Sequence, residues 1–289
     1  MRIACIGEAM IELSMAGEAA HVGVAGDTLN TAIYLHRSAP ELQVDYVTNL
    51  GDDPFSDQIK TFIANQNIGT DAITMVPGAS PGLYAITTSE TGERSFTYWR
   101  SASAARGMFQ AGDTCNFSSL SQYNAVYLSG ISMAILPHPV RLALIEWFQD
   151  SDVQVIYDSN YRPRLWEDAD TARKVTTAMW ARADIALPSI DDEMELFEET
   201  ADQVTARFAK HQGTGALKRS ALGPLSLGVP VQQDYMPAPS VVDTTAAGDS
   251  FNGGYLGSLL LDSTQADALM AGHNCAAKVV QYRGAIIPA

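Results

Sequence analysis

Short apolar runs that end in small or polar residues recur along the chain, and helical patterns lie between them. Each of the runs RIACIG, QVDYVTNLG, YNAVYLSG, DVQVIYDSN and ADIALPS predicts a buried strand. Residues 137–150 and 166–182 have helical spacing, as do GDTLNTAIYLHRSA and DPFSDQIKTFIANQN. Asp53 and Pro54 suit the N-cap and the first position of the last of these helices. The alternation predicts an α/β fold: a doubly wound, mostly parallel sheet with helices on both faces.

Two segments do not follow this alternation of buried strands and helices. Residues 82–100 alternate between polar and apolar positions around SETGER, which has the composition of a hairpin turn. Together with residues 10–25 they predict a small antiparallel β sheet beside the main body, serving as a lid, a dimer contact or both. The expected organisation is one domain, 1–289, with a lid formed by about 10–25 and 82–100.

Composition excludes several classes of partner. The chain has 289 residues, 46% of them hydrophobic, which is enough for a large core. Its formal net charge of −15 argues against nucleic acid or an anionic membrane as a partner. Glu8 and Glu12 interrupt the first apolar stretch, so we expect no signal peptide. No window approaches the ~18 apolar residues that a membrane span needs. Cys5, Cys115 and Cys275 are far apart, which fits a reducing cytoplasm.

The acidic balance makes clustered arginines informative. Arg94, Arg100 and Arg106 fall within thirteen residues, and NYRPR contains Arg162 and Arg164. Scattered surface cations explain such clusters as well as a binding site does, on composition alone. The functional interpretation is a small anionic substrate, because guanidinium groups match the geometry of carboxylates and phosphates.

The stretch DTTAAGDSFNGGYL, residues 243–256, combines small residues with two glycines inside a predicted helix. Glycine in a helix interior costs roughly 1 kcal/mol relative to alanine, so Gly253 and Gly254 need a reason. Small residues before a helix let backbone amides approach a ligand, and the helix N-terminus attracts an anion. Asp249 would lie beside that anion as a base for an attacking hydroxyl. Helix capping by Asp249, with glycines that serve packing alone, explains an isolated AAGD equally well.

This stretch resembles the C-terminal signature of the PfkB, or ribokinase-like, family of sugar kinases. GEAMIEL and AGDTLNTAIYL are similar to the family's N-terminal strand and sugar-binding segment, and the likeness covers essentially the whole chain. GISMAILP, DSNYRPRLW, QYRGAIIP and residues 82–100 resemble one branch, the kinases of 2-dehydro-3-deoxygluconate (KDG). The resemblance implies a ribokinase-like fold and transfer of the γ-phosphoryl group of ATP, with Mg²⁺, to a sugar hydroxyl.

The resemblance also implies roles for individual residues. Asp249 would be the general base, and an anion hole would be formed by the amides of Ala246, Ala247 and Gly248. The residues that would bind the acceptor are Gly26, Asp27, Asn30, Tyr84, Tyr98, Arg100, Asn160 and Arg162. The residues that would bind the nucleotide are Ser189, Lys218, Ser220, Gly223, Gly248, Asn274 and Ala277. Asp158 is expected only to orient its neighbours, and Arg164 to lie at the surface.

The nucleotide side departs from the family pattern. Many members carry N-x-x-E where this chain has Ser189 to Asp192, so Asp192 is a candidate Mg²⁺ ligand with a carboxylate one methylene shorter. Where the family has K-x-G, Lys218 is present but Ser220 takes the place of the glycine. Serine lacks the backbone freedom of glycine, so this change either weakens ATP binding or reshapes the loop. The need for a monovalent cation near residues 243–245 stays open.

The expected function is a cytoplasmic kinase of a sugar acid, acting as a homodimer or a higher homo-oligomer. One alternative is another sugar kinase of the fructokinase or ribokinase type, although a neutral sugar needs no arginine such as Arg100. The other is a sugar-acid-binding protein that has lost phosphoryl transfer. Only the departures at Ser189 and Ser220 support it, and the intact AAGD and Lys218 argue against it.

Overall fold

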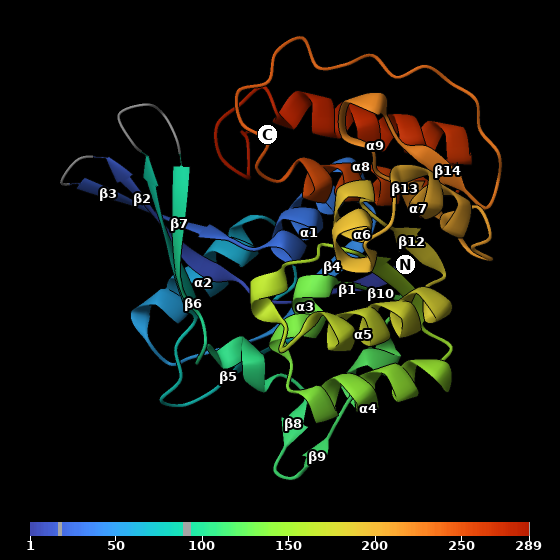
Figure 1. Ribbon diagram of the computed structural model, residues 1–289. Coiled ribbons are helices and arrows are strands. Elements are labelled where there is room, and N and C mark those ends of the chain that lie inside the picture. The colour runs from blue at the N-terminus through green and yellow to red at the C-terminus, as the bar shows by residue number, and fades with distance from the viewer. Residues whose placement is uncertain (17–18, 89–93, 289) are drawn as a thin grey trace.

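An eight-stranded sheet forms the centre of the computed structural model, which describes residues 1–16, 19–88 and 94–288 (Figure 1). The strand order is β14-β13-β12-β11-β10-β1-β4-β5, and all neighbours pair in parallel except β13 and β14. The predicted α/β fold is therefore confirmed. The strands are β1 (Arg2–Ile6), β4 (Gln43–Leu50), β5 (Ile73–Met75), β10 (Ala125–Ser129), β11 (Gln154–Asp158), β12 (Ile185–Leu187), β13 (Thr214–Leu217) and β14 (Leu225–Leu227).

Helices cover both faces of this sheet (Figure 1). On β1, Ile3 and Cys5 point into one apolar core, while Ala4 and Ile6 point into the other. The first core is closed by α1 (Asp27–Ser38), α2 (Pro54–Asn65), α8 (Ala247–Leu259) and α9 (Gln265–Val279). The second is closed by α3 (Gly130–Ile135), α4 (His138–Gln149), α5 (Ala169–Arg182), α6 (Ile190–Phe197) and α7 (Ala201–Phe208). Strands buried on both sides explain the nearly continuous apolar runs of the sequence.

The order of the strands reverses at β1, which lies between β4 and β10. Chain segments that leave β1 and β10 at their carboxyl ends diverge there, and ligands of such folds bind at that point. The turn after β10 is fixed locally: Ser129 caps α3, and the Ser132 hydroxyl donates to the carbonyl of Ile6 at 2.7 Å. The fold thus directs a ligand to the ends of these two strands.

The lid is a separate four-stranded sheet that projects from one side of the main body (Figure 1). It contains β2 (Met10–Ala16), β3 (Ala19–Ala25), β6 (Gly82–Thr88) and β7 (Arg94–Trp99), in the order β3-β2-β6-β7. Both hairpins are antiparallel as predicted. The central strands β2 and β6 pair in parallel, which the sequence did not predict, and this pairing joins the two antiparallel hairpins into one sheet. The predicted turn at residues 89–93 lies outside the described residues.

The glycines of α8 allow this helix to lie unusually close to its neighbours. A Cβ atom on Gly253 would lie 2.5 Å from Cβ of Tyr34 on α1, and one on Gly257 would lie 2.7 Å from Cβ of Ser38. On the other side, a Cβ atom on Gly254 would lie 2.8 Å from Cβ of Cys275 on α9. Glycine is therefore required for packing between α1 and α9, which offsets its cost in the helix.

Among the described helices, none combines the length and the apolar character that crossing a membrane requires.

Candidate active site

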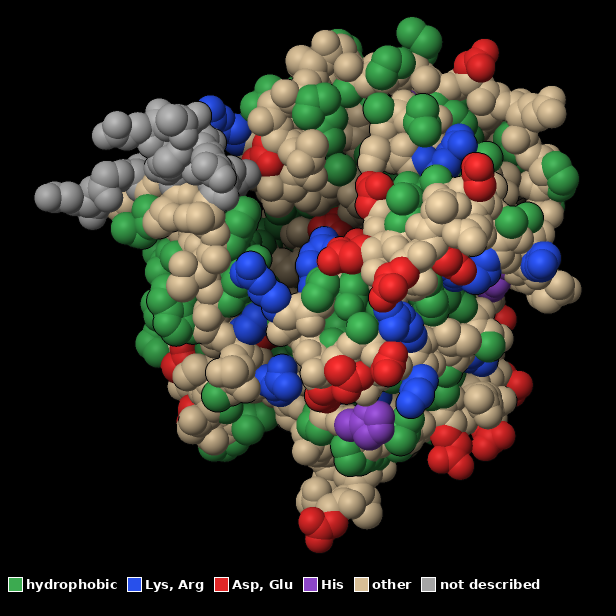
Figure 2. Space-filling view, viewed as in Figure 1, with side chains coloured by type: hydrophobic (Ala, Val, Ile, Leu, Met, Phe, Trp, Pro, Cys, Tyr) green, Lys and Arg blue, Asp and Glu red, His purple; other side chains and the backbone are tan. Residues whose placement is uncertain are grey.

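A cleft of about 1830 Å³ lies where the carboxyl ends of the strands face the lid, and Figure 2 shows the hollow between the two parts. Sites for single drug-sized ligands measure about 300–1,000 Å³, so this cleft has room for two ligands side by side. Residues from the lid, from α1, from the strand ends and from α8 and α9 line it. Two substrates that react with each other fit such a space.

Asp249 lies on the cleft wall in the first turn of α8. Ala246, just before the helix, has φ 58°, a left-handed conformation that turns the chain into the helix. The amide of Ala247 donates to the carbonyl of Thr244 at 3.1 Å, so it is already engaged. The amides of Ala246 and Gly248 donate to no residue that the structure describes. An anion at this helix end would thus find two free donors rather than the three that were predicted.

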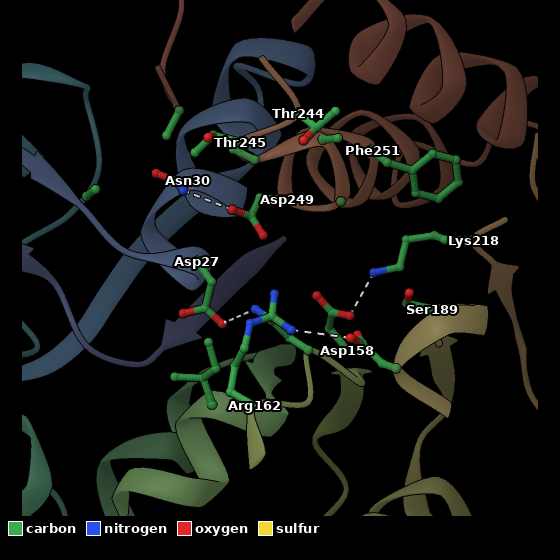
Figure 3. Close-up of a pocket in the computed structure, with 18 of the residues that line it drawn as sticks. Asp27, Asn30, Asp158, Arg162, Ser189, Lys218, Thr244, Thr245, Asp249 and Phe251 are labelled. Atoms are coloured by element: carbon green, nitrogen blue, oxygen red, sulfur yellow. Dashed lines mark hydrogen bonds and ion pairs between the residues drawn. The ribbon is translucent and has the colours of Figure 1, made fainter. Parts of the chain in front are cut away.

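Two carboxylates, Asp249 and Asp27, enter the predicted acceptor side of the cleft from α8 and α1 (Figure 3). Asn30 donates to Oδ2 of Asp249 at 2.9 Å, and Asn160 donates to Oδ2 of Asp27 at 2.8 Å. Burial and the negative charge of Asp27 raise the pKa of Asp249 to about 8. Burial also raises the pKa of Asp27, against the hydrogen bond from the Ser129 hydroxyl.

A buried polar network holds Lys218 at the end of β13. Its ammonium group contacts Asp158 at 2.7 Å (Figure 3). It also donates to Asn252 at 3.2 Å. Asn252 donates in turn to Asp158 at 2.8 Å and to the hydroxyl of Tyr127 at 3.1 Å. Asp158 therefore orients Lys218, in agreement with the expected positioning role, and the lysine is presented to the cleft with its charge balanced.

Asp192 lines the cleft at the start of α6, among the residues predicted to meet the nucleotide. Its carboxylate accepts from the hydroxyl of Ser159 at 3.0 Å and pairs with Arg162 at 3.2 Å. Burial raises the pKa of Asp192, while the charge of Arg162 lowers it. In the described part of the chain, no three His, Cys, Asp or Glu side chains gather as metal ligands. The donor set nevertheless fits Mg²⁺, which binds through one or two carboxylates and takes its other ligands from water and phosphates.

On the lid side, the predicted residues Tyr84, Tyr98 and Arg100 all line the cleft. Tyr84 and Tyr98 are cross-strand partners whose rings lie 5.6 Å apart. The Tyr84 hydroxyl donates to Glu12. Arg100 forms an ion pair with Glu8, whose side chain is 1% exposed. Neither glutamate was predicted to belong to the site, because the sequence offered them only as interruptions of an apolar stretch.

Two predicted nucleotide residues lie elsewhere. Gly223 does not line the cleft, and a Cβ atom there would lie 2.4 Å from the ring of Tyr235, so it packs beneath a loop. Asn274 lies on the exposed side of α9, and the neighbouring His273 lines the cleft instead, because each helical residue is rotated by about 100° from the last. Ser220 does line the cleft and has φ 49°, the left-handed conformation in which glycine is most favourable.

Every other predicted site residue lines the cleft, and so do residues that the sequence had not singled out. Arg164, expected at the surface, is exposed but also faces the cleft. The additional lining residues include Glu195, Thr244, Ala276 and Val280, and Arg106 of the arginine cluster noted in the sequence also lines the cleft.

Comparisons with known proteins agree with this geometry. Residues 1–289 match the family described as pfkB family carbohydrate kinase. The chain is 42% identical to a 2-dehydro-3-deoxygluconokinase of Dickeya dadantii, over 99% of this chain and 96% of that protein. It is 39% identical to a 2-dehydro-3-deoxygluconokinase of Escherichia coli K12, over 99% and 97%. A Vibrio cholerae fructokinase, crystallised with fructose, ADP and calcium, has a TM-score of 0.81 at 22% identity, over 98% and 94%. The chain belongs to the PfkB family of carbohydrate kinases.

Proposed function

We propose that this kinase transfers the γ-phosphoryl group of ATP to the 6-hydroxyl of KDG. The observation that carries the proposal is Asp249, which lies at the open N-terminus of α8 on the wall of a cleft large enough for two substrates. The names of the relatives at 42% and 39% identity support the choice of acceptor. The cationic side chains on the lid side and along the cleft favour an acidic sugar over a neutral one as the acceptor.

Asp249 acts as the general base in this proposal. Asn30 occupies its Oδ2, and Oδ1 accepts no hydrogen bond from the described residues, so Oδ1 takes the proton of the sugar hydroxyl. The hydroxyl oxygen forms a bond to the γ-phosphorus, and the bond to the bridging β–γ oxygen breaks with its electron pair leaving on ADP. A base with a pKa near the working pH is efficient, and about 8 meets that condition.

The acceptor is oriented by hydrogen bonds from α1 and from the end of β11. Asp27, Asn30 and Asn160 offer carboxylate and amide groups to the sugar hydroxyls. Gly26 keeps the backbone open, since a Cβ atom there would lie 2.3 Å from the carbonyl oxygen of Glu8. Positioning of this kind contributes to catalysis by holding the hydroxyl in line with the phosphorus.

The acid end of the sugar meets Arg100, with Tyr84 and Tyr98 beside it. Arg162 serves the phosphoryl end, because its half-exposed guanidinium lies next to Asp192 on the nucleotide side.

The nucleotide lies along the opposite half of the cleft. Ser189, Lys218, Ser220 and Ala277 line that half, and Lys218 presents a positive charge to the phosphates. Asp192 would hold Mg²⁺, which when bound neutralises charge on the β- and γ-phosphates. The free amides of Ala246 and Gly248 face the charge that develops on the transferred group.

A substrate panel tests the proposal. Purified protein is supplied with Mg-ATP and, in turn, with KDG, fructose, ribose and gluconate, and ADP release is measured. We expect the highest kcat/KM with KDG. Equal or better turnover of fructose or ribose would assign the chain to a neutral-sugar kinase. Binding of KDG without ADP release would identify a binding protein that has lost phosphoryl transfer.

A further inference from the structure

The ion pair between Glu8 and Arg100 joins the main body to the lid. Glu8 lies in the turn between β1 and β2, and Arg100 follows directly after β7. The side chains are 1% and 10% exposed, so both charges are withdrawn from water at the base of the lid. Burial of an ion pair is rarely favourable for stability alone, since the lost hydration offsets the attraction. A buried pair at the edge of a substrate cleft therefore suggests a role in binding.

The surrounding backbone makes room for this pair. A Cβ atom on Gly82, the first residue of β6, would lie 2.5 Å from Oε1 of Glu8 and 3.1 Å from Cβ of Arg100. The backbone of Glu8 also lies against Gly26, at the start of the segment that carries Asp27 and Asn30. Glu8 thus contacts both halves of the acceptor site.

Glu8 accepts a hydrogen bond from only one nitrogen of the Arg100 guanidinium. Nη2 of Arg100 donates to Oε2 of Glu8, and Nη1 donates to no residue that the structure describes. Arginine presents its donors in a rigid planar fork, so fixing one edge fixes the direction of the rest. Arg100 lines the cleft, and its Nε is buried with no partner among the described residues, so the ion pair with Glu8 leaves guanidinium donors for a ligand in the cleft.

We propose that Glu8 is a positioning residue for recognition of the sugar acid: it holds Arg100 so that the remaining donors meet the substrate carboxylate. This inference rests on the proposed function and adds to it a residue that acts through another. Glu8 does not touch the substrate and takes no proton. Its removal allows the Arg100 side chain to rotate away, which weakens binding of the acid and leaves ATP binding unchanged.

A double-mutant cycle measured through the KM for KDG tests this proposal. Glu8→Ala should raise this KM about tenfold, and Arg100→Ala should raise it about ten- to a hundredfold, the range for one charge-assisted hydrogen bond. If Glu8 acts through Arg100, the double variant should match Arg100→Ala alone, because there is no guanidinium left to position. The KM for ATP should stay within about twofold in all three variants.

Two further variants separate positioning from charge and from folding. Glu8→Gln keeps an acceptor at the same place and should hold the KM for KDG within about threefold, whereas Glu8→Asp keeps the charge but is too short and should raise it about tenfold. As the matched control, Asp45→Asn removes the charge of another ion pair, between the buried Asp45 and the partly exposed Arg2, and neither of these residues lines the cleft. That control should lower thermal stability without changing the KM for KDG.

The outcomes separate this inference from the proposed function. If the wild-type enzyme does not phosphorylate KDG, both are overturned. If it does, and Glu8→Ala leaves the KM for KDG unchanged, raises it equally with and without Arg100, or changes kcat and the KM for ATP to the same degree, only the positioning role is overturned.

Discussion

Asp249 and Asp27 are two carboxylates that face one cleft from different helices, and each is bound by a different asparagine. Their mutual repulsion and their burial favour the protonated form of Asp249 in the empty enzyme. Asn30 and Asn160 each donate one hydrogen bond and so fix which oxygen atoms remain available. The chemistry of the site therefore depends on these few atoms, and two predictions concern Asp249.

Replacing Asp249 by Asn should abolish the base while keeping the size of the side chain. We expect kcat to fall about 10²–10⁴-fold, the usual contribution of a positioned base. The Kd for KDG, measured by calorimetry, should change little, because Asn30 and Asp27 remain in place. Turnover near the wild-type level in the Asn variant would show that another group takes the proton.

The raised pKa of Asp249 predicts a pH profile. The base works in its deprotonated form, so kcat/KM should rise about tenfold per pH unit below pH 8 and level off above it, since this parameter reports the free enzyme. The raised pKa of Asp249 also makes the free energy of unfolding depend on pH. The folded state keeps the proton that the unfolded chain loses near pH 4, so this group's contribution to stability is lost as the pH rises from there toward about 8.

Two measurements check the predicted direction of the pH dependence, one for kcat/KM and one for the free energy of unfolding. Steady-state assays between pH 6 and pH 9 give the profile of kcat/KM, and urea unfolding of the wild type and Asp249→Asn over the same range gives the stability difference. The Asn variant should gain stability relative to the wild type as the pH increases. A flat kcat/KM profile across this range would contradict the assignment of the pKa to the catalytic base.

At the level of elements, α8 is held between α1 and α9 by glycines that no larger residue can replace. Gly253→Ala would bring a Cβ atom to 2.5 Å from Cβ of Tyr34 and 2.7 Å from the backbone nitrogen of Leu35. Overpacking of this kind typically costs 1–3 kcal/mol, so we expect a loss of about that size in the free energy of unfolding, measured by urea denaturation. The first turn of α8 should also shift and lower kcat.

Gly248→Ala is the matched control in the same helix. A Cβ atom there would meet only Nζ of Lys218, at 3.8 Å, so it causes no clash. Its free energy of unfolding should equal or exceed that of the wild type, because alanine is about 1 kcal/mol better than glycine within a helix. Equal losses in the two variants would show that the close packing of α8 is not what requires glycine.

The sequence predicted those elements whose signal is local. The apolar runs, the N-cap at Asp53 and the glycine-rich start of α8 each depend on neighbours within a few residues, and each is confirmed. Contacts between distant segments left no such signal. Glu8 and Arg100 are separated by 92 positions, and nothing in either local pattern shows that they meet.

Three other differences have local physical causes. Asn274 was predicted to line the cleft, but the neighbouring His273 lines it instead. A helix turns by about 100° per residue, so an error of one position moves the predicted side chain to another face of the helix. Ser220 replaces a glycine of the family pattern, yet it adopts the left-handed φ of 49° that glycine would favour. The parallel pairing of β2 with β6 was missed because each hairpin, considered alone, is antiparallel.

At the scale of the whole molecule, the lid presents two sheet edges, β3 and β7, and large apolar side chains. Trp99 is 57% exposed. Unpaired edges and exposed aromatic residues are commonly covered by a second subunit, so we expect a homodimer formed through the lids. The wild-type protein should elute in size-exclusion chromatography with light scattering at twice the 31.0 kDa of the chain.

Trp99→Lys should shift this assembly toward the monomer and raise the KM for KDG, because the lid then loses its support. Leu142→Lys on α4 is a suitable control, since Leu142 is 51% exposed and lies on an element far along the chain from the lid. It should leave the dimer intact. A wild-type protein that stays monomeric at all concentrations and is fully active would contradict the dimer but not the lid.

The lid and the main body divide the cleft between them, and this division has a consequence for protein engineering. Asp249, Lys218 and the open end of α8 all belong to the main body, while Tyr84, Tyr98 and Arg100 belong to β6, β7 and the residue that follows. The residues that we propose for phosphoryl transfer are thus encoded apart from those that we propose for recognition of the acid. Exchanging residues 82–100, with Glu8 as their anchor, is therefore the natural graft for redirecting this scaffold to a new acceptor while its transfer chemistry is left untouched.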